Sequence, residues 1–231
     1  MAKARKHPSD VGGRSARTQD ALVRAAISAL RDVGFAGASA REIARRAGCN
    51  QALVFYHFGS VDGLLLAALD DISARRMEAY RPLLDGTRDS VAGLVKATRA
   101  IFTEDLEAGH VKVLVEMITG AQSVPGLGEQ VARRLVPWRD LAESMVENAL
   151  GASPVVLVMP AKLIAHALVA GFLGLELLAD LDGDPEQALA LFDRAASIAG
   201  LLDHLGLLSQ PALIDAFTRT LLNRMEGDSR K

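Results

Sequence analysis

The sequence predicts an all-α protein, and three observations support that fold class. Half of the 231 residues are hydrophobic but only 4% are aromatic, a balance that favours helix formers over the side chains that strands prefer. Helix-capping residues and glycine stops recur along the chain, and no stretch alternates apolar and polar residues as a half-buried strand does. The chain could form one domain of about 200 residues or two smaller ones, each with a sizeable core.

The first helices are predicted from their apolar spacing and their end signals. Gly34 ends the first, and Ser39 and Glu42 open the second as a capping box in which each side chain accepts from the other's free amide. Gly48 ends the second helix in a position that tolerates positive φ, and Asn50 caps a short third helix. The predicted ranges are 18–33, 39–47, 51–58 and 60–81.

The rest of the chain is also predicted to be helical. Pro137 should kink or divide one long helix, and Asp184 with Pro185 opens another. The predicted ranges are 89–108, 112–122, 127–150, 160–181, 184–205 and 211–226. We expect a basic flexible arm over residues 1–15, a helix-turn-helix domain over 16–62 and a helical body over 63–231 that binds a ligand and dimerises.

The near-neutral net charge of −2 conceals an uneven distribution. Residues 1–60 contain ten Lys or Arg against four Asp or Glu, a formal charge of +6, whereas residues 61–231 contain sixteen against twenty-four, a charge of −8. Basic segments attract phosphate backbones and acidic segments avoid them. Chance clustering of charge on a solvated surface is the alternative interpretation.

The segment 39–57 has the spacing of a helix-turn-helix. Ala44 supplies a small residue at the crossing of the two helices, Gly48 the turn, and Val54 a packing residue on the second helix. One face of that second helix then projects outward, and the DNA major groove is wide enough to admit it.

This segment resembles the DNA-binding part of the tetracycline-repressor (TetR) family. The resemblance covers residues 15–69, and its most specific elements are Ile43-Ala44, Ala47-Gly48 and His57-Phe58. It implies an all-helical, homodimeric transcriptional regulator, mostly a repressor, that binds double-stranded DNA at a palindromic operator and releases it when a small, largely apolar effector binds. An alternative is a helix-turn-helix protein whose C-terminal part binds a protein partner or no effector.

The resemblance also assigns DNA-contacting roles to individual positions. Ser39 matches a phosphate contact, and Arg41 is favoured over Arg45 and Arg46, which could instead form a solvated helix face. Gln51 reads adenine or faces water and phosphate, and the basic arm is a mobile tail or a minor-groove insertion. The full predicted DNA-binding set is Ser39, Arg41, Asn50, Gln51, Ala52, Phe55, Tyr56 and His57. The sequence departs from the family at Phe55, Ala52 and Val61, where tyrosine, glycine and lysine are usual.

Two helices near the C-terminal end are apolar almost all round, so each should be covered on more than one side. We expect them to pack against a second copy as a four-helix bundle; the alternative is that they are core helices of one subunit. The predicted interface residues are Leu163, Ala167, Gly171, Leu175, Phe192, Ala196, Ala199 and Leu202.

A ligand pocket is implied by the resemblance alone. Its predicted lining is Phe102, Glu116, Met117, Trp138, Met145, His166 and Phe172, with Met159 and Gln122 as further candidates. Each of these residues could instead belong to an ordinary core.

Other classes of function find no support in the sequence. The histidines show no metal-ligand spacing, and there is no phosphate loop, nucleophile elbow or paired-carboxylate pattern, so we expect no catalytic site, metal or cofactor. Proline interrupts the apolar segment 148–175, so a membrane span is not expected. Residues 1–17 lack a signal-peptide pattern. The single cysteine, Cys49, excludes an intrachain disulfide and favours a reducing cytoplasm.

Overall fold

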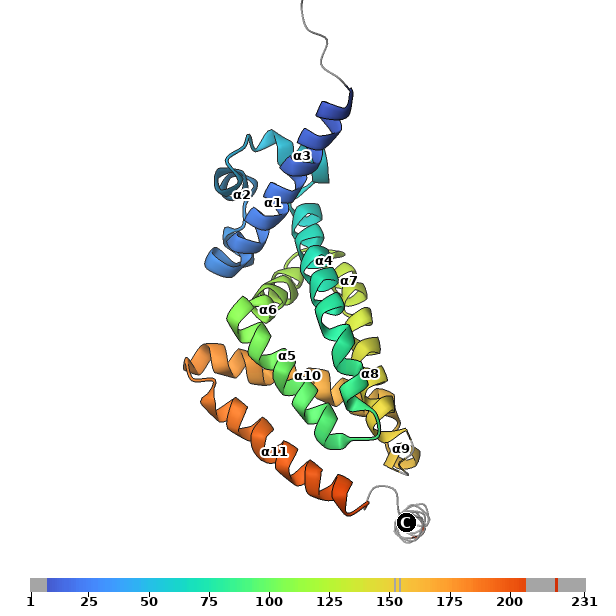
Figure 1. Cartoon of the computed structure of the whole chain (residues 1–231). Coiled ribbons are helices and arrows are strands. Elements are labelled where there is room, and N and C mark those ends of the chain that lie inside the picture. The colour runs from blue at the N-terminus through green and yellow to red at the C-terminus, as the bar shows by residue number, and fades with distance from the viewer. Residues whose placement is uncertain (1–7, 152, 154, 207–218, 220–231) are drawn as a thin grey trace, which may run out of the picture. The chain divides into compact units, whose positions relative to one another are not determined.

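The computed structural model describes residues 8–151, 153, 155–206 and 219, and every regular element among them is helical (Figure 1). This confirms the predicted all-α class. The chain divides into two compact units. Unit 1 comprises Met1–Glu78 and Gly109–Val136, and unit 2 comprises Ala79–Ala108 and Pro137–Lys231.

The helices of unit 1 share one apolar core. They are α1 Pro8–Gly37, α2 Ala40–Ala47, α3 Ala52–Phe58, α4 Val61–Tyr80 up to Glu78, α6 His110–Ala121 and α7 Leu127–Arg134. Leu22, Ile43 and Val54 are fully buried and join α1, α2 and α3. Leu64 and Met117 extend the same core onto α4 and α6. The helix-turn-helix elements therefore share a core with α6 rather than folding around one of their own.

The end of α1 is attached to α6 at a bend. Gly34 has φ 69° and ψ −179°, a conformation that L side chains rarely adopt. Beyond it, the Phe35 N–H donates to Glu116 Oε2 at 2.8 Å. The Phe35 ring lies over Gly120 of α6, where a Cβ would come within 2.1 Å of the ring carbon Cγ. Glycine at both positions thus permits a close approach between α1 and α6.

Unit 2 is built around α5. Its elements are the 3₁₀ helix η1 Arg81–Thr87, α5 Val91–Ala108, α8 Val136–Leu150 from Pro137 on, α9 Val155–Val158, α10 Ala161–Asp182 and α11 Glu186–His204. α11 lies along α5 (Figure 1), and the carboxylate of Asp203 accepts from the Ser90 hydroxyl at 2.9 Å and from the Ala92 N–H at 3.0 Å. A residue at the end of α11 therefore caps the start of α5.

Three boundaries bear on the predictions. α1 begins at Pro8, before the predicted helix start at residue 18 and within the segment 1–15 that was expected to form an arm. A proline suits a first helical turn, and the polar residues that follow Pro8 have no apolar stripe that would predict a helix. The division expected at Pro137 is confirmed, since α7 ends at Arg134 and α8 begins at Val136. Residues 1–7 of the predicted arm, and the predicted helix over 211–226 except Arg219, lie outside the described residues.

Candidate nucleic-acid interface

The start of α2 carries half of the predicted capping box. The Ser39 hydroxyl accepts from the Glu42 N–H at 3.3 Å, as expected for an N-cap. The reciprocal bond from the Ser39 N–H to the Glu42 carboxylate is replaced, because the Ser39 N–H donates to the Gly37 carbonyl at 2.8 Å. Ser39 remains exposed to solvent, so its hydroxyl proton can still be donated outward.

The Glu42 carboxylate is instead held by two arginines. It accepts from Arg45 at 2.6 and 2.9 Å and from Arg46 at 2.7 Å, and these bonds, with Arg45 the larger contributor, lower the pKa of Glu42 to about 2. Arg46 also donates to the Ser28 hydroxyl at 2.7 Å and to the carboxylate of Asp32. Arg46 thus ties α2 to α1, and its guanidinium is occupied by contacts within unit 1.

The turn between α2 and α3 follows the predicted geometry. Gly48 has φ 65° and ψ 32°, the left-handed conformation that glycine adopts without a steric penalty. Its N–H returns to the carbonyl of Arg45 at 3.3 Å. Cys49 is half-buried and packs against the core, and burial raises the pKa of its thiol.

The short helix α3 presents one face to solvent. Its first turn is capped by Asn50, whose side-chain oxygen accepts from the Ala52 N–H at 2.8 Å, and Val54 anchors it in the core with no exposed surface. On the side of α3 that faces away from the core, Phe55 is 50% exposed and Tyr56 is 80% exposed. Ala52 is also exposed and shares their face, because residues three and four apart are neighbours on a helix.

All of the predicted DNA-binding residues except His57 are exposed on unit 1. Ser39 and Arg41 at the start of α2, Gln51 before α3, and the face of α3 are all exposed. His57 is half-buried, and its ring meets that of Tyr56 edge-on at 4.8 Å. The side-chain oxygen of Asn50 accepts the hydrogen bond that caps α3, so this residue stabilises the start of the helix.

Val61 shows why the start of α4 departs from the family pattern. Its side chain is half-buried and packs against the core of unit 1, so this position contributes packing where a lysine would offer a charge. The neighbouring Ser60 hydroxyl accepts from the Gly63 N–H at 2.9 Å and caps the helix.

The residues predicted to line a ligand pocket are divided between the two units. Glu116 and Met117 belong to unit 1, where the first binds Phe35 and the second is fully buried in the core. The other five belong to unit 2. Phe102 and Phe172 share one cluster at a ring distance of 5.8 Å, Met145 packs in another, Trp138 meets Tyr80 edge-on, and His166 is exposed.

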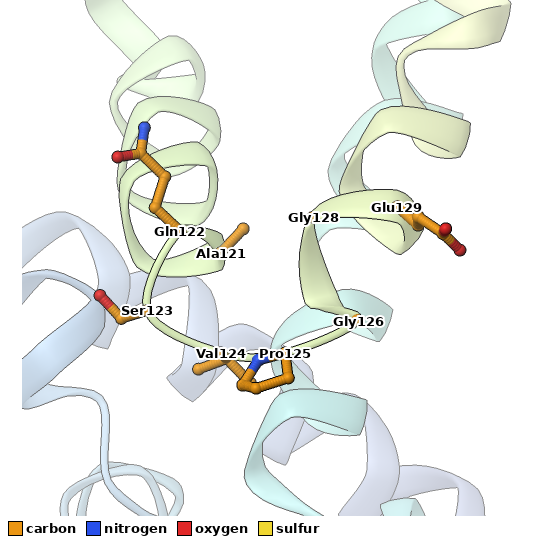
Figure 2. Close-up of a pocket in the computed structure, with 8 residues that line it drawn as sticks. All are labelled: Ala121, Gln122, Ser123, Val124, Pro125, Gly126, Gly128 and Glu129. Atoms are coloured by element: carbon orange, nitrogen blue, oxygen red, sulfur yellow. The ribbon is translucent and has the colours of Figure 1, made fainter.

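A shallow hollow of about 380 Å³ lies at the connection from α6 to α7 (Figure 2). Figure 2 shows Val124 and Pro125 on the connecting loop, between Gln122 at the end of α6 and Glu129 on α7. Of the residues named as ligand candidates, Gln122 lines this hollow. Its lining mixes apolar side chains with polar side chains and glycines, whereas a largely apolar pocket was expected.

The predicted dimer residues separate into two groups. On α10, Leu163, Ala167 and Gly171 are exposed and Leu175 is half-buried. On α11, Ala196 and Leu202 are half-buried, whereas Phe192 and Ala199 are buried within the chain's own core. The exposed apolar residues of α11 and its C-cap lie outside the predicted interface set: Leu191, Ile198, Leu201 and, at the C-cap, Leu205. These recur at intervals of seven, three and four residues, a spacing that could have identified them.

α10 is also long and apolar enough to cross a membrane by length and composition, with a mean hydropathy of 1.7 over the relevant window. Only 17% of that window is buried within the chain. A helix–helix interface and a lipid contact would both cover such a surface.

Comparison with known proteins points to one class. Residues 22–68 match the sequence model described as "Bacterial regulatory proteins, tetR family". Over 174 residues the chain is 29% identical to the HTH-type transcriptional regulator BetI of Cronobacter sakazakii, covering 71% of this chain and 80% of that protein. A BetI from Stenotrophomonas maltophilia is 35% identical over 81 residues, covering 33% of this chain and 41% of that protein.

Solved structures share the fold. The fatty acid degradation regulator FadR from Bacillus halodurans matches with a TM-score of 0.65 at 14% identity, covering 78% of this chain and 96% of that one. FadR from Bacillus subtilis, solved in complex with stearoyl-CoA, matches with a TM-score of 0.63 at 11% identity. This match also covers 78% of this chain and 96% of that one. At such identities the similarity describes the fold.

Proposed function

The chain belongs to the tetR family of bacterial transcriptional regulators, and from that premise we propose that it is a cytoplasmic repressor that binds a palindromic operator as a homodimer. The observation that carries the proposal is the exposed surface formed by the start of α2 and the outer face of α3. That surface lies in the basic segment of the chain, where residues 1–60 have a formal charge of +6. A helix of this kind, aligned by a second helix that meets the backbone, is how helix-turn-helix proteins read DNA.

The roles of the exposed residues follow from their chemistry. Ser39 and Arg41 donate to phosphates at the start of α2, where the helix N-terminus also favours an anion. Tyr56 adds a phenolic hydroxyl on α3, and Gln51 pairs bidentately with an adenine in the major groove. Arg46 makes no DNA contact in this scheme, because it is bound to Ser28, Asp32 and Glu42.

Pairing of two copies positions two such surfaces on one operator. The exposed apolar residues of α10 and α11 are the proposed contact, with Leu163 and Leu181 on α10 and Ile198 and Leu201 on α11 as principal members. Two α3 helices about 34–36 Å apart would reach successive major grooves on one side of the duplex. An operator with twofold symmetry is the DNA that such a dimer matches.

Release by an effector is the regulatory part of the proposal. The structural neighbour that was solved with stearoyl-CoA supports an effector with a long acyl chain, and we place its site in unit 2. A ligand that binds one conformation of unit 2 more tightly would shift the population away from the DNA-binding form. The scattering of the predicted pocket residues over separate clusters favours the second candidate, in which unit 2 binds a protein partner or no effector.

Selection from random-sequence DNA tests the DNA-binding part. The full chain should enrich a palindrome whose half-site centres lie 10–10.5 base pairs, or a multiple of that, apart. On the enriched operator, Arg41→Ala should weaken binding about equally for matched and mutated sites and reduce the salt dependence of binding. Arg88→Ala, which removes the same charge from an exposed position in unit 2, is the matched control and should leave affinity unchanged.

Enrichment of no sequence, or equal binding to all sequences, would contradict a repressor that reads an operator. Titration of the bound complex with stearoyl-CoA, and separately with coenzyme A, distinguishes the two candidates for unit 2. Release by the acyl form alone supports an apolar effector, and retention of the operator with both favours the second candidate.

A further inference from the structure

Two exposed positions on the solvent-facing side of α3 carry no hydrogen-bonding side chain. Ala52 and Phe55 lie on this side three residues apart, and neither side chain can donate or accept a hydrogen bond. Phe55 is 50% exposed, whereas its neighbour Val54 is fully buried and Phe58, three residues further on, packs against the core. Its ring is therefore not required for the packing of α3, and its exposure needs another explanation.

The chemistry of the major groove restricts what such a surface can read. Base edges there present donors and acceptors, and the one apolar group among them is the C5-methyl of thymine. Ala52 and Phe55 have no polar group to pair with guanine, cytosine or adenine. A methyl group and an aromatic ring are, however, suitable apolar contacts for that methyl.

Resting on the proposed operator binding by α3, we infer that Phe55 is a specificity-determining residue that reads a thymine methyl, with Ala52 completing the apolar contact. The occupant of this face is thus a T·A pair of B-form DNA. The positive charge of residues 1–60 supplies the attraction that brings the duplex to it.

The neighbouring side chains fit the same base composition. Gln51 is exposed directly before α3, and its amide matches the N6 and N7 pattern of adenine. Asn50 cannot serve both purposes at once, because its oxygen caps α3 through the Ala52 N–H. Methyl readout by Phe55 and adenine readout by Gln51 together specify an A·T-rich core in each half-site.

Replacing thymine by deoxyuridine tests the inference, because it removes the methyl and leaves the hydrogen-bonding pattern of the base unchanged. The operator is first selected from random DNA with the full chain, and each thymine is then replaced singly by deoxyuridine. Wild-type affinity should fall about fourfold at one thymine of each half-site, the change that corresponds to ~0.8 kcal/mol for one buried methyl-sized group. Phe55→Ala should bind the thymine and deoxyuridine operators equally at that position.

Tyr56→Phe is the matched control, since it changes the adjacent exposed ring by removing only the hydroxyl. It should lower overall affinity and keep the fourfold preference for thymine. Thermal melting of each variant should match the wild type, because both rings are exposed.

The possible outcomes distinguish a failure of methyl readout by Phe55 from a failure of the proposed operator binding. Sequence-specific binding with no deoxyuridine effect at any position would overturn the inference and leave operator binding intact. A deoxyuridine effect that persists in Phe55→Ala would assign the methyl contact to another side chain and also overturn it. Absence of any selected operator would contradict the proposed function itself.

Discussion

α3 of unit 1 and α11 of unit 2 both expose apolar side chains, but the two helices differ in length and in what surrounds these side chains. α3 has seven residues, with Phe55 and Tyr56 exposed beside the capped start of α2. α11 has nineteen residues, with Ile198 61% and Leu201 63% exposed. At 1.5 Å per residue, the first is about 10 Å long and suits a groove, whereas the second, at about 28 Å, suits another helix.

This difference indicates that the two units use apolar exposure for different purposes. In unit 1, a few exposed rings lie among polar and basic groups, as an interface that must read a polar surface requires. In unit 2, exposed leucine and isoleucine recur along one face of α11, as in helices that pack against a partner. Each variant below changes a contact assigned to one unit.

The largest effect is expected from a charge on α11. Leu201→Glu should reduce dimerisation by about 2–4 kcal/mol, since a buried carboxylate at a packed contact has no partner. Operator affinity should then fall ~30- to 1,000-fold, measured by fluorescence anisotropy, while sedimentation shows a monomer. Val136→Glu places the same charge at an exposed position outside α10 and α11 and should stay dimeric. A Leu201→Glu chain that remains a dimer would contradict the role assigned to α11.

A smaller effect is expected where α1 meets α6. Gly120→Ala places a Cβ 2.1 Å from the Phe35 ring carbon Cγ, so the ring must move, at a cost of about 1–3 kcal/mol in the free energy of unfolding. Gly128→Ala on α7 meets only the Ala121 carbonyl at 3.9 Å, and should change stability by no more than ~0.5 kcal/mol. Chemical denaturation measures both. Equal effects of the two variants would show that the Phe35 contact is not tight.

The hydrogen bond at the bend of α1 should contribute less. Glu116→Ala leaves the Phe35 N–H without its acceptor and should destabilise the chain by about 1–2 kcal/mol. Glu116→Gln retains an oxygen acceptor and should recover at least half of that loss in the same denaturation experiment. The dimer should persist in both variants, because the bond lies within unit 1. A Gln variant as unstable as the Ala variant would mean that the carboxylate acts through its charge rather than through this bond.

The smallest effect is a pH dependence carried by Glu42. Its pKa is lowered from 4.5 to about 2 by Arg45 and Arg46, so the stabilisation is fully present above pH 4.5 and is lost as the pH falls toward 2. Wild type should therefore lose more stability than Glu42→Gln between pH 4.5 and 2, and the two should show parallel profiles from pH 5 to 7. Thermal melting across this range measures the difference. Parallel profiles throughout would contradict the ion pairing of Glu42.

Much of unit 1 could be predicted from the sequence because its signals are local. Gly48 requires a left-handed turn, Asn50 caps its own helix, and Val54 lies at the spacing of a packed residue. The second half of the capping box failed as a prediction because Arg45 and Arg46 compete for the Glu42 carboxylate. Arg46 also bonds to Ser28 and Asp32 of α1, and such a contact between helices cannot be predicted from local sequence signals.

Unit 2 was less predictable because its important features are long-range. An apolar helix does not reveal which of its faces a neighbour covers, so Phe192 was assigned to the dimer although it packs against Phe102 of α5. The cap that Asp203 provides for α5 joins residues more than 100 positions apart. The expected pocket residues were chosen by type, and their side chains fall in separate clusters.

If unit 1 reads DNA while unit 2 pairs two copies, the number of chains bound to a selected operator should be two. Sedimentation of the full chain with a palindromic duplex, and with a duplex carrying one half-site, measures how many chains bind each. Two chains should bind the palindrome, and binding to the half-site duplex should be much weaker. A single chain on the palindrome, with equal affinity for the half-site, would contradict this division of roles.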